Sequence, residues 1–166
     1  MIARIVGLVL LAVATLYALD RWALRPLRCI HAAAVDGELL DQAAKKKNDR
    51  TLRLARRTLG QLDDCECVSP PDVVIPFARG AASEILGDYK AAIAEYERAL
   101  QIDRRPEIYF RLGVTQLNAL DRPSAIENLT RACAFDPKLL NDIPYEDVRK
   151  ETKERLRGRY SRDWMK

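Results

Sequence analysis

The side chains best able to do chemistry are three of the four cysteines and the single histidine. Cys29 and His31 are separated by one residue, as are Cys65 and Cys67. Two cysteines in contact form a disulfide in an oxidising compartment, or act as a redox pair when one thiol has a depressed pKa. All four side chains together match the ligand number of zinc, although one-residue spacers are not its usual spacing.

The rest of the sequence has no catalytic constellation. A single histidine, no paired nucleophile and base, no glycine-rich phosphate loop and no haem-attachment motif leave no reaction to assign. We therefore predict no catalytic residue, no metal and no cofactor, and a protein that is not an enzyme. A redox role for Cys65 and Cys67 is the main enzymatic alternative.

Two helices are expected to position the cysteines. Apolar residues recur at helical spacing over residues 26–46 and again over residues 49–62, where Asp49 is a plausible N-cap. The following Cys65–Asp72 segment contains two prolines and is predicted to be a loop.

An antiparallel arrangement of these helices would bring Cys29 close to Cys65 and Cys67. This geometry permits a disulfide from Cys29 to either of them. Free thiols and a metal site that includes His31 remain the alternatives.

The N-terminal segment is predicted to be a single-pass membrane anchor formed by residues 2–22. Residues 5–19 are apolar apart from one threonine, and Arg4 and Arg21 can extend their charged groups to the two interfaces. Trp22 lies where an interfacial aromatic belt would place it. A cleaved signal peptide is the alternative, but no small-x-small cleavage site follows the apolar stretch at a suitable distance.

Two signals in the sequence disagree on which side of the membrane this signal anchor places the C-terminal part. Arg21, Arg25 and Arg28 outnumber Arg4, which by the charge rule leaves the C-terminal part in the cytoplasm. Short N-terminal anchors commonly export the domain C-terminal to them, and a disulfide would require that side. We expect the exported, periplasmic side of a bacterial inner membrane, with a cytoplasmic location as the alternative.

Two stretches of the chain repeat each other at a spacing of 33 residues. The matched pairs are Gly80 with Gly113, Asp88 with Asp121, Ala92 with Ala125, Ala99 with Ala132 and Asp103 with Asp136. The small residues are expected to let neighbouring helices approach closely, with Tyr96 and Leu129 filling the space between them. Gly87, Asp88 and Asp121 are expected to make the turns.

These residues resemble the tetratricopeptide repeat (TPR) family over residues 72–137. Pro76 stands where an early aromatic residue is expected, Arg79 replaces a leucine, and Arg104 replaces the terminal proline. The resemblance implies an all-α array of right-handed antiparallel helical hairpins.

Four segments are expected from this pattern. We predict a transmembrane anchor at 1–25, a hairpin that is a degenerate repeat at 26–71, two repeats at 72–137, and a C-terminal capping helix and tail at 138–166.

The resemblance also implies a groove lined by the first helix of each hairpin. The inward-facing positions are Val74, Phe77, Ala81, Glu84 and Ile85 in the first repeat and Glu107, Phe110, Val114, Leu117 and Asn118 in the second. This lining is mostly apolar and lacks the lysines and asparagines with which some relatives clamp a terminal carboxylate. We expect it to bind an apolar helix or extended segment of a partner protein, unless the chain's own hairpin or capping helix fills it.

The predicted function is therefore protein binding at a membrane. One hypothesis is an accessory or assembly subunit of a larger, hetero-oligomeric membrane complex, and the alternative is a scaffold that recruits soluble partners. Nucleic acid is not an expected partner, because the net charge is only +4 and the basic C-terminal helix lacks interleaved aromatic residues.

Overall fold

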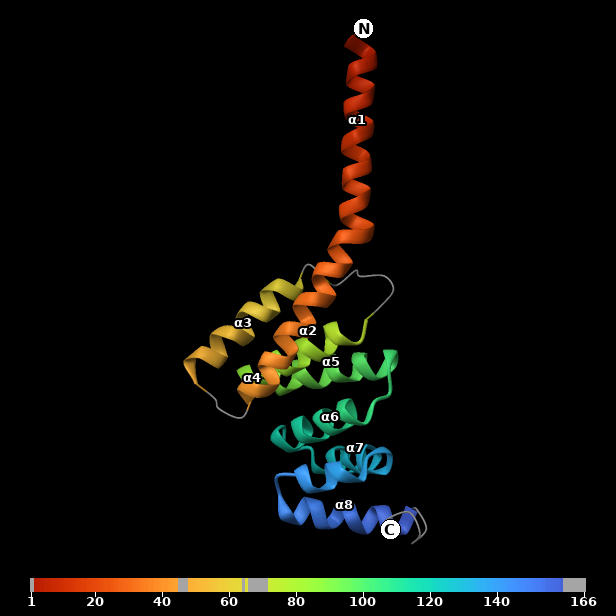
Figure 1. Cartoon of the computed structure of the whole chain (residues 1–166). Helices are drawn as coiled ribbons and strands as arrows, with labels where there is room; N and C mark the ends of the chain where they lie inside the picture. The colour runs from red at the N-terminus through yellow and green to blue at the C-terminus, as the bar shows by residue number, and fades with distance from the viewer. Residues whose placement is uncertain (1, 45–47, 64, 66–71, 160–166) are drawn as a thin grey trace.

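The computed structural model describes residues 2–44, 48–63, 65 and 72–159. All regular structure in these residues is helical, which confirms the predicted all-α class (Figure 1). One long helix leads from the N-terminus into a stack of shorter helices that ends with α8 (Figure 1).

The N-terminal helix does not stop before the hairpin. α1 (Ile2–Leu19) continues through a π-helical turn (Asp20–Leu24) into α2 (Arg25–Ala44). Pro26 explains the π turn, because its ring clashes with the carbonyl four residues earlier and it has no N–H to donate. The wider π turn relieves this clash. In it, the Arg25 N–H bonds to the carbonyl of Asp20, five residues earlier, and not to that of the residue four positions earlier.

The remaining helices follow as hairpins. They are α3 (Asp49–Asp63), α4 (Val74–Leu86), α5 (Tyr89–Ile102), α6 (Pro106–Asn118), α7 (Arg122–Phe135), a 3-10 segment (Pro137–Asp142) and α8 (Glu146–Arg159). Both α2 and α3 pack on α4, and the later helices pack on one another in chain order.

Side-chain caps define where three helices begin. Asp88 accepts from the Ala91 N–H at 3.0 Å to start α5, and Asp121 accepts from the Ser124 N–H at 3.3 Å to start α7. The prediction of Asp49 as a cap was wrong. Asn48 is the cap: its side chain accepts from the Thr51 N–H at 3.0 Å, while the Thr51 hydroxyl accepts from the Asn48 N–H.

Glycines at the helix crossings allow the hairpins to close. A Cβ on Gly80 would lie 2.8 Å from the Tyr96 ring, and one on Gly113 would lie 2.7 Å from Leu129. Tyr96 and Leu129 are fully buried. The sequence-based assignment of these four residues to the helix–helix contacts is thus confirmed.

The core consists of clusters that each join neighbouring helices. The first joins α2, α3 and α4 and holds Cys29, Ala33, Leu62, Ile75 and Ala78 together with Cys65, which follows α3. The second joins Ala55 of α3 to α4, and the third joins α5 to α6. The fourth joins α7 to residues 137–159, which comprise the 3-10 segment and α8 and are called the capping segment. The hairpin over 26–71 is therefore packed onto the repeats through its described residues.

Candidate functional site

The predicted groove lining on α4 is largely engaged in packing. Phe77 contacts the Tyr96 ring with centroids 5.6 Å apart, and Val74 packs against the cluster that holds the α2 cysteine. Ile85 is 7% exposed and lies in a cluster with Ala55 of α3. Ile85 is thus an interior residue and not part of an open groove, because α3 covers it.

The predicted lining on α6 is more accessible. Phe110, Val114 and Leu117 are half-buried and pack against the cluster formed by α7 and the capping segment. Asn118 is half-buried at the end of α6, and Glu107 is exposed at its start. The capping segment therefore rests beside part of this face, and the rest of each side chain stays open to solvent.

A polar contact joins α4 to α5. The Tyr96 hydroxyl donates to the Glu84 carboxylate at 3.1 Å. Burial raises the pKa of Glu84, because a buried carboxylate loses its hydration, and the bond from Tyr96 offsets this only in part. Burial, with the nearby Glu84 charge, raises the pKa of Tyr96 well above its usual value. Glu84 thus links α4 to α5 through this hydrogen bond instead of facing a partner protein.

Sequence reasoning missed a second groove, about 730 Å³ in volume, between α5 and α7 with α6 as its floor. Its lining residues are Glu97, Leu100, Gln101, Arg104, Tyr109, Leu112, Gln116, Ser124, Glu127, Asn128 and Arg131. The TPR pattern places a tyrosine three residues after the helix glycine, and here that residue is Gln116. Gln116 lines this groove, so that departure from the pattern was the available signal.

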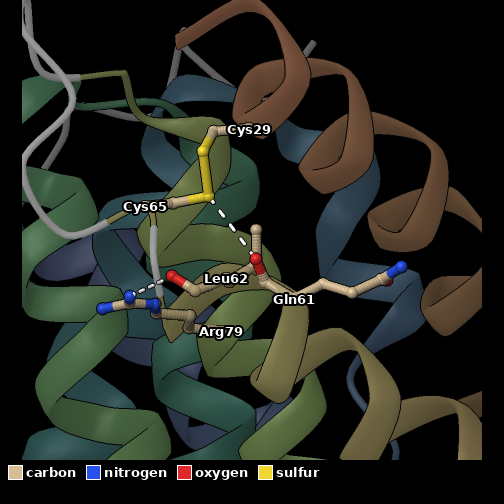
Figure 2. The surroundings of a disulfide bond; sticks show 5 residues. All are labelled: Cys29, Gln61, Leu62, Cys65 and Arg79. Atoms are coloured by element: carbon tan, nitrogen blue, oxygen red, sulfur yellow. Dashed lines mark hydrogen bonds between the residues drawn. A yellow bond between two sulfur atoms is a disulfide. The ribbon is translucent and has the colours of Figure 1, made fainter. Parts of the chain in front are cut away.

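The structure pairs Cys29 with Cys65, whose Cα atoms lie 5.7 Å apart (Figure 2). Both cysteines are buried. Cys67, the alternative partner, lies outside the described residues. His31 is exposed, and the described residues contain no cluster of histidine, cysteine and carboxylate side chains that could hold a metal.

Arg79 explains one departure from the repeat pattern. Its guanidinium donates to the Leu62 carbonyl at the end of α3, next to the disulfide (Figure 2). It also lies 3.9 Å from Glu95 of α5. The same carbonyl accepts from the Cys65 N–H at 2.9 Å, and a cation at a helix C-terminus adds a favourable interaction with the helix dipole. Arg79 therefore joins the first hairpin to the repeat where a leucine would not.

Comparison with known families decides the class of the chain. The TPR repeat family matches residues 85–119, which run from the end of α4 through α5 to the end of α6. The chain contains a TPR repeat over these residues. Neither the comparison with curated proteins nor that with solved structures gives a match.

TPR hairpins form a protein-interaction fold, so the repeat region is a protein-binding module. The N-terminal part of the chain is an apolar helix that does not pack on the array. The region Val6–Ala34 is the one described helix long and apolar enough to cross a membrane, and its apolar window is not covered by the rest of the chain. A membrane span and a signal sequence share these properties.

Proposed function

We propose that this TPR protein is anchored in a membrane by α1 and binds a protein partner on its repeats, as an accessory or assembly subunit of a larger membrane complex. The observation that carries this proposal is the joining of an uncovered apolar helix to a repeat array by continuous helix. A helical connection of this kind holds the array at the membrane surface instead of on a loose tether.

The exposed side chains of α1 support a lipid environment. Leu8, Leu10, Leu11 and Leu16 are each at least 65% exposed. A contiguous apolar surface of this kind is unfavourable in water and favours burial in a bilayer or against other membrane spans.

The Cys29–Cys65 disulfide favours an exported location for the array, because disulfides persist in oxidising compartments. A membrane-impermeant thiol reagent, applied to intact cells carrying a Cys67→Ser variant, tests this side. Labelling of Cys29 and Cys65 only after impermeant reduction is the expected result. Labelling that requires opening the cytoplasmic side would reverse the orientation.

Cys133 is an internal control for that experiment. It is fully buried in α7, and burial, with two nearby aspartates, raises the pKa of its thiol to about 12. The thiolate that reacts with such reagents is therefore scarce at neutral pH, and Cys133 should stay unlabelled as long as the array is folded.

We propose the half-exposed face of α6 as the partner site, with Phe110, Val114 and Leu117 as its apolar centre. A photo-reactive residue placed at Glu107 or Asn118 would lie at the two ends of this face. The matched control is Gln101, which is exposed in the other groove. Crosslinks to one defined protein from Glu107 and Asn118 would support the proposal, and crosslinks from Gln101 alone would transfer the site to the groove between α5 and α7.

Detergent extraction then distinguishes the two functional hypotheses. A subunit is expected to co-purify with membrane proteins at fixed stoichiometry. A recruiting scaffold would release soluble partners at a variable ratio, and recovery of the chain alone would contradict the subunit hypothesis.

A further inference from the structure

A cavity of about 380 Å³ lies where α2 leaves the N-terminal helix. It is lined by Arg25, Arg28, Cys29, Ala32, Gln61 and Cys65. The disulfide holds its two walls together, because Cys29 belongs to α2 and Cys65 follows the end of α3. The lining thus combines the guanidinium groups of Arg25 and Arg28 and the amide of Gln61 with a disulfide that fixes the two walls.

The cavity carries a net positive charge. Arg25 lies 3.6 Å from Asp20, and Arg28 donates a hydrogen bond to the same carboxylate. Two cations against one anion leave a charge of +1, and the Asp20 contacts hold both guanidinium groups at the start of α2. Guanidinium groups match phosphate oxygens in charge and in hydrogen-bond geometry.

The cavity lies at the depth of lipid headgroups if α1 spans the bilayer. An apolar core of about 30 Å, filled from Ile2 at about 1.5 Å per residue, ends near Arg21. Arg25 and Arg28 then lie about 6 and 10 Å farther along the helix. The headgroup layer on each side is about 5–7 Å thick, so Arg25 lies within it. Arg28 lies just beyond it, and its hydrogen bond to Asp20 draws its guanidinium back toward the membrane.

Exposed apolar residues surround the same part of the helix. Trp22 is 80% exposed, Leu24 is 48% exposed and Leu27 is 65% exposed. Leu27 is next to Arg28, on the same helix as the buried Cys29 and Ala33. A phospholipid whose acyl chains contact these side chains would place its phosphate beside Arg25 and Arg28.

We infer that this cavity binds the headgroup of an anionic phospholipid, with the phosphate between Arg25 and Arg28 and Gln61 as an additional hydrogen-bonding group. The inference rests on the proposed anchoring of α1. It adds a lipid selectivity that anchoring alone does not require.

Quenching of Trp22 fluorescence by brominated lipids tests this inference. The full chain with Trp164→Phe, which leaves Trp22 as its single tryptophan, is reconstituted in phosphatidylcholine vesicles containing one tenth brominated phosphatidylglycerol or brominated phosphatidylcholine. We expect the anionic lipid to be enriched about fivefold at Trp22, the factor that one uncompensated arginine provides near a membrane surface.

Two variants and one control make the result specific. Arg25→Gln with Arg28→Gln should abolish the preference. Gln61→Phe, which keeps both charges but fills the cavity, should abolish it as well. Arg50→Gln with Arg53→Gln makes the same change of charge at the opposite end of α3 and should retain it. Non-reducing mass spectrometry verifies the disulfide in each variant.

The outcomes separate the two proposals. Equal quenching by both lipids would overturn the headgroup site while leaving the anchor intact, whereas no quenching by either lipid would overturn the anchor itself. A preference that survives Gln61→Phe would mean diffuse surface charge and no built site. Loss of the preference in millimolar inorganic phosphate would assign the cavity to a soluble anion and contradict the lipid inference.

Discussion

At the scale of single residues, the two repeat turns differ in how well their residues suit the backbone. Gly87 ends α4 with a φ of 84°, and Leu120 occupies the equivalent place after α6 with a φ of 63°. Left-handed backbone suits glycine and costs a leucine about 1–2 kcal/mol. Leu120 is also 91% exposed, so its side chain recovers little through packing.

Leu120→Gly is therefore expected to stabilise the protein by about 1 kcal/mol, after allowing for the greater freedom of glycine in the unfolded chain. Chemical denaturation measures the change. Ala119→Gly is the matched control, because Ala119 itself has a φ of −85° and gains nothing from glycine. A loss of stability in both variants would contradict the assignment of strain to Leu120.

Glu84 should give the fold a pH dependence of its own. Its pKa is raised in the folded state, so between the unfolded pKa and this raised value the folded protein binds more protons than the unfolded chain. The free energy of unfolding contributed by Glu84 therefore falls as pH rises through that window. Glu84→Gln keeps an acceptor for the Tyr96 hydroxyl and removes the titration.

We expect Glu84→Gln to unfold at a higher temperature than the wild type at neutral pH and at a similar temperature below the ordinary glutamate pKa. Thermal unfolding followed across this pH range measures both. A constant difference between the two proteins at every pH would show that Glu84 does not titrate in this window.

At the scale of elements, the glycines differ in whether the neighbouring helix leaves room for a Cβ atom. Gly80 faces the Tyr96 ring, whereas a Cβ on Gly60 of α3 would meet nothing within 4 Å. Both glycines lie inside helices, so alanine gains about the same helix propensity at each. Only packing distinguishes the two positions.

Gly80→Ala is expected to destabilise the array by about 1–3 kcal/mol, the usual cost of overpacking, because the buried Tyr96 ring has little room to move. Gly60→Ala should instead stabilise it by up to about 1 kcal/mol through helix propensity. Equilibrium denaturation of both variants checks the opposite signs. Equal effects would mean that the α4–α5 crossing tolerates a side chain.

At the scale of the whole molecule, the disulfide closes the first hairpin, and Arg79 joins that hairpin to the repeats. Cys29 and Cys65 are 36 residues apart in sequence, and the bridge between them encloses all of α3. Crosslinks of this span typically stabilise a fold by about 2–4 kcal/mol. The hairpin otherwise depends on packing against α4 and on the bond from Arg79 to the Leu62 carbonyl.

Cys29→Ser removes the partner of both Cys65 and Cys67, and it should lower the free energy of unfolding by about 2–4 kcal/mol. Limited proteolysis should then cut around α3 before it cuts α5–α7. Reductant should reproduce the effect in the wild type and leave Cys29→Ser unchanged. Cleavage at the same sites and rate with and without the bridge would contradict this role.

Local signals in the sequence determined much of this protein. Helical periodicity, the paired small residues and the aspartate caps each act within one helix or one hairpin, so they can be read from neighbouring positions. They predicted the helices, the hairpin turns, the close approach of helices at Gly80 and Gly113, and the placement of Tyr96 and Leu129 between helices. The apolar N-terminal segment is equally local.

Only the tertiary structure decided which surfaces stay open, because that depends on contacts between segments distant in the chain. It buried Ile85 under α3, set the capping segment beside α6 and opened a groove over Gln116. It also turned Arg79 toward the end of α3 and paired Cys29 with Cys65. Such contacts depend on how whole helices stack, and spacing along one helix does not specify what the next helix covers.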